Sequence, residues 1–231
     1  MALNRISKSL RQRILSSLLL APFVILLIYY GGAFFNTLII FMTIIMTTEW
    51  MGIITNRIDD INEPITPRSR KWTIYGILYV GIFASSLIYL RSLEEGLAAI
   101  LFLVLLVWTT DIAAYFTGKM IGGPKIWKSV SPNKTWAGLI GAMIATGLVG
   151  IILSIFMPYN YFTMFVFGAL VAVIAQIGDF MESALKRKFK VKDSGNIIPG
   201  HGGIMDRMDG FVTVTPIFTI ISLLNNGDFL K

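Results

Sequence analysis

Acidic and basic side chains gather in the C-terminal third of the sequence in a pattern that suits chemistry on phosphates. Asp206 and Asp209 are three residues apart, which puts them on one face at the start of a helix, and Asp179 lies at the end of an apolar segment. Carboxylates arranged in this way suit a hard divalent cation such as Mg²⁺. Arg207 lies between the two aspartates and would hold phosphate oxygens, so the set predicts phosphoryl or nucleotidyl transfer.

A stripe of charged residues follows Asp179. Helical spacing places an acid at its start and basic residues after it on a single face. The residues with this spacing are Asp179, Glu182 or Ser183, Lys186 and Lys190. An amphipathic helix on anionic lipid is the simpler interpretation, but it does not account for the glycine-rich loop that follows, which surrounds His201, the single histidine of the chain.

Two runs further upstream add polar residues at the ends of apolar segments. Asp111 should face the protein interior or water, because a carboxylate facing lipid is costly. Its alternative role is a structural ion pair. In the run Ser131-Pro132-Asn133-Lys134-Thr135, Thr135 or Asn133 can cap the next helix, and the exposed N–H groups with Lys134 form an anion site. A capped helix start with a snorkelling lysine is the alternative there.

Membrane helices are the elements that must position these residues. Hydrophobic residues make up 55% of the 231 residues and charged residues only 14%, whereas a soluble domain has about 25% charged residues. The absence of cysteine excludes a disulfide framework and a thiolate nucleophile. Seven stretches approach the length of about 20 apolar residues that spans a bilayer. They are 14–30, 34–54, 72–90, 97–117, 136–157, 160–178 and 210–224. We therefore predict an all-α polytopic integral membrane protein with about seven transmembrane helices.

The distribution of Lys and Arg predicts the orientation. The segments 1–13, 55–71, 118–135 and 179–209 hold 18 of the 20 basic residues, which favours a cytoplasmic location for them and for the N-terminus. Seven crossings would put the C-terminus outside and the polar site at the cytoplasmic interface. We expect N-terminal transmembrane helices over 1–95 and a catalytic transmembrane region over 96–231, with cytoplasmic loops 118–135 and 179–209, in one compact membrane domain. Glu49, inside an apolar stretch, is expected to pair with a basic loop residue and fix helix packing.

These motifs resemble a known family. The run Ser183-Ala-Leu-Lys186-Arg187…Lys192-Asp193…Pro199-Gly200-His201-Gly202-Gly203-Ile-Met-Asp206-Arg207-Met-Asp209 resembles the signature of the phosphatidate cytidylyltransferases, or CDP-diacylglycerol synthases. The runs Asp111…Ala114-Tyr115…Gly118-Lys119 and Ser131–Thr135 resemble the family pattern in the same order. The resemblance covers about residues 105–215 of the printed sequence. Two positions depart from the pattern: Ala137 stands where the family usually has Glu, and Gly210 where it often has Ser.

The resemblance implies a reaction in which CTP and phosphatidic acid give CDP-diacylglycerol and pyrophosphate. It implies Asp179 and Asp206 as ligands of Mg²⁺, with a monovalent cation such as K⁺ sharing the site. The implied catalytic residues are Lys186, Arg187, His201, Arg207 and Asp209. The implied substrate-binding residues are Asp111, Tyr115, Ser131, Asn133, Lys134, Thr135, Lys192 and Asp193.

Two other functions fit parts of the sequence. A CTP-dependent lipid kinase would transfer the γ-phosphate instead of the cytidylyl group, and the complete signature argues against it. A transporter could use Glu49, Asp111 and Asp179 as a polar pathway, but no inverted repeat is evident. The expected setting is a bacterial cytoplasmic membrane with membrane lipids as partners and no nucleic acid, and a homodimer is left open.

Overall fold

The protein is described by a computed structural model that covers residues 18, 21–55, 67–156, 158–197 and 202–226. Within these ranges, six helices are long and apolar enough to cross a membrane. They are α2 (Gly32–Thr55), α3 (Pro67–Ser92), α4 (Gly96–Met120), α5 (Trp136–Leu153), α6 (Tyr161–Lys188) and α7 (Met205–Leu224). A shorter apolar helix, Ala21–Tyr30, lies within the first predicted stretch, part of which falls outside the described residues. The chain is an all-α polytopic membrane protein, as its hydropathy predicts.

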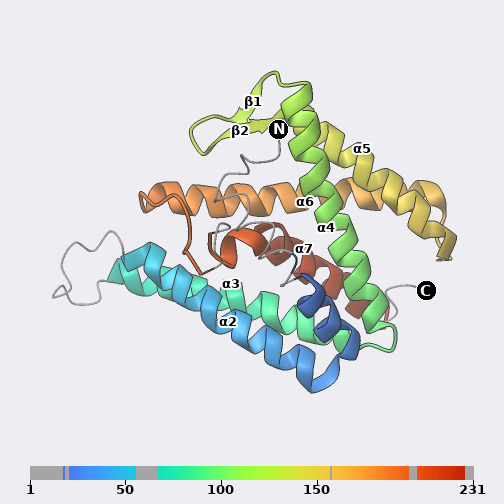
Figure 1. Cartoon of the computed structure of the whole chain (residues 1–231), viewed down its shortest axis with the longest axis horizontal. Coiled ribbons are helices and arrows are strands. Elements are labelled where there is room, and N and C mark those ends of the chain that lie inside the picture. Colours follow the sequence, from blue (N-terminus) through green and yellow to red (C-terminus); the bar gives the residue numbers. More distant parts are fainter. Residues whose placement is uncertain (1–17, 19–20, 56–66, 157, 198–201, 227–231) are drawn as a thin grey trace, which may run out of the picture.

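Helix α7 occupies the centre of the helical assembly. It lies between α3 and α6 and packs against both, while α2 runs beside α3 and α5 runs beside α6 (Figure 1). Three aromatic rings join α4, α6 and α7 inside the bundle: Phe218 lies 6.0 Å from Phe102 and 5.4 Å from Phe167, measured between ring centroids. Burying such large rings supplies much of the packing between these helices.

Helix α6 continues ten residues past the end of its predicted apolar stretch at 178. Half of the added residues are charged, and the i,i+4 ion pair between Glu182 and Lys186 supports the helix there. The helix ends at Lys188, and Lys190 has a left-handed backbone with φ of 57°. The expectation that Lys190 shares a helix face with Asp179 is therefore wrong.

A short β-hairpin, which the sequence did not predict, occupies the connection between α4 and α5. Strand β1 (Lys125–Trp127) pairs antiparallel with β2 (Ser131–Thr135). Thr135 Oγ1 accepts a hydrogen bond of 3.0 Å from Gly138 N and so caps α5, as predicted. Arg187 Nε donates to Val130 O at 3.3 Å, which ties the hairpin to α6.

Arg91 closes the end of the bundle opposite the hairpin. Its Nε donates to Ile28 O at 2.9 Å, and its Nη2 donates to Tyr29 O at 3.1 Å. These are carbonyl groups at the C-terminus of the helix Ala21–Tyr30, where a cation is favoured. A local structural role therefore accounts for one of the two basic residues that lie outside the segments predicted to be cytoplasmic.

Candidate active site

An ion pair between Lys134 and Asp179 joins β2 to α6. The pair connects Lys134 Nζ with Asp179 Oδ2, and Ser183 Oγ donates to the other oxygen of Asp179 at 3.2 Å. Lys134 Nζ also lies 4.6 Å from the centre of the Phe180 ring, a cation–π contact. The side chains of Lys134 and Asp179 are 17% and 29% exposed, but Lys134 Nζ itself is buried, so Asp179 is the more open member of the pair.

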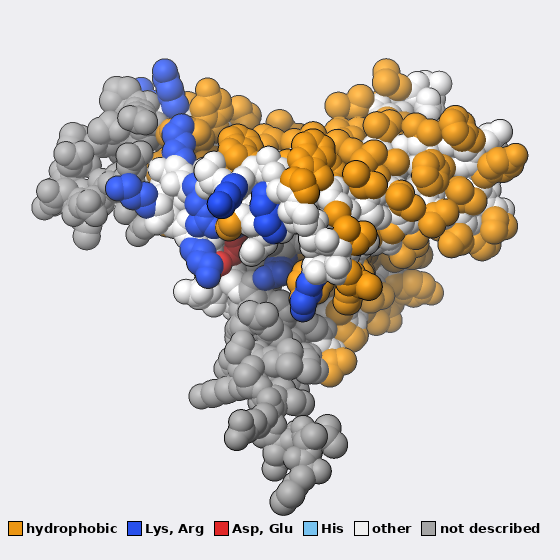
Figure 2. Space-filling model, turned by 90° about the horizontal axis from the view of Figure 1, so that it is seen from above, with side chains coloured by type: hydrophobic (Ala, Val, Ile, Leu, Met, Phe, Trp, Pro, Cys, Tyr) orange, Lys and Arg blue, Asp and Glu red, His pale blue; other side chains and the backbone are white. Residues whose placement is uncertain are grey.

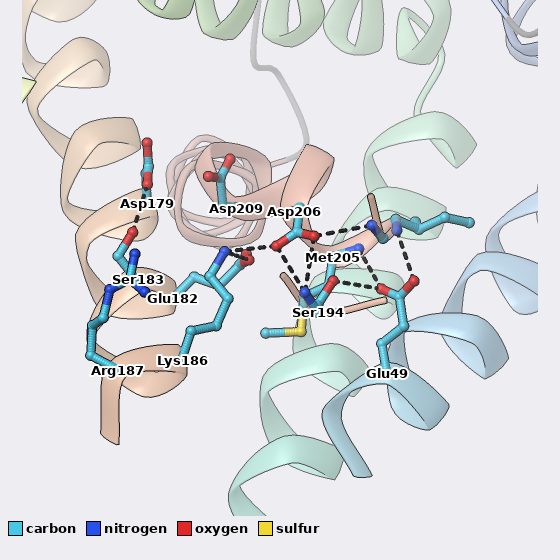
Figure 3. Close-up of polar contacts among 12 residues, drawn as sticks. Glu49, Asp179, Glu182, Ser183, Lys186, Arg187, Ser194, Met205, Asp206 and Asp209 are labelled. Carbon is cyan, nitrogen blue, oxygen red and sulfur yellow. Dashed lines mark hydrogen bonds and ion pairs between the residues drawn. The ribbon is translucent and has the colours of Figure 1, made fainter. Parts of the chain in front are cut away.

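Two further acids act on this pair from neighbouring helices. The charge of Asp209 on α7 interacts with the charges of Asp179 on α6 and Asp111 on α4. The positive charge of Arg207 in turn acts on Asp111. Figure 3 shows the carboxylates of Asp179 and Asp209 directed to the same side. Acidic side chains from three helices therefore act on one another in the region of Lys134 and Arg207.

Gly178 allows α6 and α7 to approach closely enough to bring these acids together. A Cβ atom at this position would lie only 2.4 Å from the carbonyl oxygen of Asp209 and from Thr213 Oγ1, well inside van der Waals contact. Thr213 Oγ1 also donates to Ile174 O at 3.1 Å, which joins the two helices at the same level. The residue directly before Asp179 thus has to be small for the acidic cluster to form.

A second charged cluster lies deeper, around Lys186. Its Nζ contacts Glu182 Oε1 at 2.9 Å and Asp206 Oδ1 at 2.7 Å, so one cation joins α6 to α7 (Figure 3). The side chains of Glu182, Asp206 and Lys186 are 1%, 10% and 13% exposed. Charge-assisted hydrogen bonds of this kind are strong where water is excluded, and the cluster therefore fixes the start of α7.

Asp206 is surrounded by N–H donors. Besides Lys186 Nζ, it accepts hydrogen bonds from Ser194 N at 3.2 and 3.0 Å and from Gly203 N at 3.0 Å. These contacts draw the loop that follows α6 onto the first turn of α7. Its predicted role as a metal ligand stays a prediction, and in the structure both of its oxygens face N–H groups.

The remaining predicted site residues are distributed over the same end of the bundle. Arg187 contacts the hairpin, and Arg207 is exposed on α7. Ser131 is half-buried on β2, whereas Asn133, Lys192 and Asp193 are exposed. Tyr115 is 61% exposed and contacts Phe116 and Lys119, with no contact among the described residues that joins it to either charged cluster. His201 lies outside the described residues.

On the face shown in Figure 2, Lys and Arg side chains gather in one region, and an acidic side chain is visible between them. Apolar side chains cover much of the rest of the face shown. A charged patch bordered by apolar surface is the geometry expected where a membrane protein meets water. The arrangement can bind polyanions through its cations and a hard divalent cation through its carboxylates.

Two buried polar residues belong to this region although they were not predicted as site residues. Glu182 lies on the helical face predicted for Asp179 and Lys186. It precedes Lys186 by four residues, a spacing that already indicated an ion pair between the two. Glu49 on α2 is 4% exposed, and the expected basic partner is absent from its contacts in the described part of the chain. Its carboxylate instead accepts hydrogen bonds from Ser194 Oγ and from two backbone N–H groups.

The fold and the site together define an integral membrane protein that gathers carboxylates and cations at one end of a helical bundle. A sequence model described as the Cytidylyltransferase family matches residues 66–224. This range includes both charged clusters but not Glu49. The chain belongs to this family.

Individual relatives share one name. The chain is 43% identical over 159 residues to the phosphatidate cytidylyltransferase of Brucella suis biovar 1, a match that covers 67% of this chain and 58% of that protein. It is 43% identical over 150 residues to the phosphatidate cytidylyltransferase of Staphylococcus saprophyticus, covering 64% and 57%. A protein of the same name from Rickettsia bellii is 34% identical over 230 residues, covering 96% and 94%. The chain thus spans a little over half the length of the first two relatives and nearly all of the third.

Proposed function

We propose that the protein transfers the cytidylyl group of CTP to phosphatidic acid, giving CDP-diacylglycerol and pyrophosphate. The observation that carries this proposal is the junction of α6, α7 and the β-hairpin, where Lys134, Lys186 and Arg207 lie beside carboxylates. Membership in the cytidylyltransferase family and the names of the relatives support the same reaction.

In the proposed reaction, an oxygen of the phosphatidate phosphate attacks the α-phosphorus of CTP. The bond between the α-phosphorus and the oxygen that bridges to the β-phosphorus breaks, and pyrophosphate leaves with the electron pair. The phosphatidate phosphate is already ionised near neutral pH, so a strong general base is not required. The difficulty is to bring two polyanions together, and the cations Lys134, Lys186, Arg187 and Arg207 would hold them in position.

Mg²⁺ is part of the proposal, with Asp179 and Asp206 as its expected ligands and Asp209 as a further carboxylate nearby. The described residues contain no group of three or more acidic, His or Cys side chains already arranged around a metal position. Mg²⁺ does not need one, because it commonly binds through one or two carboxylates with water and substrate phosphates completing its shell. When bound, it would offset negative charge on the triphosphate and on the leaving pyrophosphate. To bind the metal, Asp179 would have to release Lys134 or Ser183, and Asp206 would have to release N–H contacts.

The proposed setting is a bacterial cytoplasmic membrane, with the N-terminus and the site facing the cytoplasm and the C-terminus outside. CTP is available on that side, and phosphatidate could enter laterally with its acyl chains still in the bilayer. The six long apolar helices support a membrane setting, and the basic residues around the site support its cytoplasmic orientation. A C-terminus outside also requires the first stretch, 14–30, to cross as a seventh segment, because six crossings would leave both termini on one side. A homodimer and a bound monovalent cation such as K⁺ remain predictions from the resemblance and the sequence.

Product analysis tests the proposal against the lipid kinase alternative. The purified full chain would be incubated with phosphatidic acid, Mg²⁺ and each of the four nucleoside triphosphates, with CTP labelled either in the base or in the γ-phosphate. Cytidylyl transfer places the base label in the lipid and the γ label in pyrophosphate. A γ label in the lipid, or equal use of all four nucleotides, would contradict the proposal. The Asp179→Asn variant controls for contaminating activity.

A further inference from the structure

The N-terminus of α7 has no acceptor of its own for its first N–H groups. An α-helix leaves its first four N–H groups without partners inside the helix. Ser, Thr, Asp or Asn usually supplies the missing acceptor at the N-cap. The N-cap of α7 is Ile204, whose side chain makes no capping hydrogen bond. This helix carries Asp206 and Asp209, so whatever secures its first turn also places the site.

Glu49 supplies the missing acceptors from a different helix. Its Oε1 accepts a hydrogen bond from Ile204 N at 2.9 Å, and its Oε2 accepts one from Met205 N at 2.8 Å. The partial positive charge of a helix N-terminus favours a carboxylate at this position. Glu49 is 4% exposed, so water does not compete for these contacts.

The same carboxylate also holds the loop that precedes α7. Ser194 Oγ donates to Glu49 Oε2 at 3.1 Å, while Ser194 N donates to Asp206 (Figure 3). Ser194 thus connects Glu49 directly to an acid of the proposed site. Gly203 leaves room for the arrangement, because a Cβ atom there would lie 2.7 Å from both carboxylate oxygens of Glu49.

We infer that Glu49 is a positioning residue, which holds the first turn of α7 and thereby orients Asp206 and Asp209 for the reaction. This inference rests on the proposed function for its effect on catalysis. It gives α2 a specific part in the site, although the family match begins at residue 66 and so leaves Glu49 outside. A carboxylate with two acceptor oxygens is needed, since an amide has one acceptor oxygen and presents N–H groups at the other position.

The test compares Glu49→Gln and Glu49→Asp with Thr48→Val in the full chain. Thr48 is a suitable control because its exposed hydroxyl donates to Ile45 O within α2 at 2.7 Å and to no other residue in the described part of the chain. Hydrogen exchange of the backbone amides would be followed over 202–206, together with kcat, KM for CTP and the thermal unfolding temperature. In Glu49→Gln we expect exchange over 202–206 to accelerate at least about tenfold relative to the rest of α7. We expect kcat to fall at least about tenfold with KM for CTP changed less than about threefold.

The conservative variant separates positioning from bulk stability. Glu49→Asp keeps the charge and should recover part of kcat, and Thr48→Val should match the unchanged protein in all measurements. A lowered unfolding temperature with normal kcat in the folded protein would overturn the inference, as would exchange that accelerates evenly along the chain. If Glu49→Gln does not fold, Glu49→Asp provides the same comparison of kcat with local exchange. An unchanged protein that makes no CDP-lipid would contradict the proposed function alone, while the exchange comparison would still decide whether Glu49 holds α7.

Discussion

Lys186 and Lys134 both contact carboxylates, but their surroundings give them different roles. Lys186 contacts two acids whose side chains are almost completely buried, whereas Asp179, the partner of Lys134, is 29% exposed. A charge left unpaired inside a protein is far more costly than one left unpaired near the surface. The two lysines should therefore respond differently when they are removed.

We predict that Lys186→Met lowers the free energy of unfolding by about 3–5 kcal/mol, because Glu182 and Asp206 lose their shared cation. Lys134→Ala should lower it by less, while kcat/KM falls about 10- to 150-fold through the loss of a phosphate contact. Denaturant unfolding and steady-state kinetics on both variants provide the measurements. Equal destabilisation by the two substitutions would show that the depth of the Lys186 cluster does not matter.

Asp179 offers a direct test of the proposed metal. Asp179→Asn should reduce turnover at least about 100-fold, because it removes a charge from the site while the helix still inserts. Glu94→Gln is the matched control, since Glu94 is exposed in the connection between α3 and α4. Activity would be measured at limiting and at saturating Mg²⁺. Near-normal activity of Asp179→Asn at limiting Mg²⁺ would exclude Asp179 as a ligand.

At the scale of the helices, the distance between α5 and α6 determines whether Lys134 can meet Asp179. Lys134 lies just before α5, and Asp179 lies on α6. The two helices approach closely at Gly168, where a Cβ atom would lie 2.4 Å from the carbonyl oxygen of Thr146. The contact is between a side chain and backbone, so it can be relieved only by moving a helix.

We predict that Gly168→Ala costs about 1–3 kcal/mol of stability through overpacking and reduces kcat by about tenfold through displacement of Lys134. Gly81→Ala is the control, because a Cβ atom at Gly81 on α3 meets no other atom within 4 Å. That substitution should leave activity unchanged and keep or slightly raise the unfolding temperature. Similar losses in both variants would mean that helical glycine itself, and not the close approach, matters.

The sequence predicted the six long membrane helices because each contains an apolar run that approaches the length of a bilayer crossing, although the last run, 210–224, is short. The ends were less accurate wherever polarity and helix formation diverge. The apolar run ends just before Asp179, whereas helix α6 continues to Lys188. The hairpin escaped prediction because its strands have only three and five residues and the second contains Pro132.

The sequence predicted most of the residues that make up the candidate site, but it did not predict which of them contact one another. Spacing along one helix placed Glu182 beside Lys186, and the structure confirms that pair. Two of the three donors to Glu49 are backbone N–H groups about 155 positions away in the chain. Every residue carries such a group, so no side-chain pattern could have singled them out. The division of acids between two clusters likewise depends on how α6 and α7 approach each other.

At the scale of the whole molecule, the two loops that carry the site must face the same side of the membrane. The natural chain has no cysteine, so single cysteines can report their location. Ser129→Cys and Asn196→Cys should react with an impermeant thiol reagent from the cytoplasmic face alone, and Glu94→Cys from the opposite face alone. Asn196 is exposed, whereas the neighbouring Ser194 is buried and would label poorly. Labelling at positions 129 and 196 from opposite faces would separate the two halves of the proposed site.

The length of α6 ties the charged site to the thickness of the lipid bilayer. A helix of 28 residues is about 42 Å long, against a hydrocarbon core of about 30 Å. Its charged final turns therefore extend past the core only when the bilayer is thin enough, and tilting can absorb part of a mismatch. Longer acyl chains would draw Lys186 toward hydrocarbon, and shorter ones would lift it into water. The protein thus carries a built-in sensitivity to the lipid matrix around it, and turnover measured across phosphatidylcholines of increasing chain length should pass through a maximum.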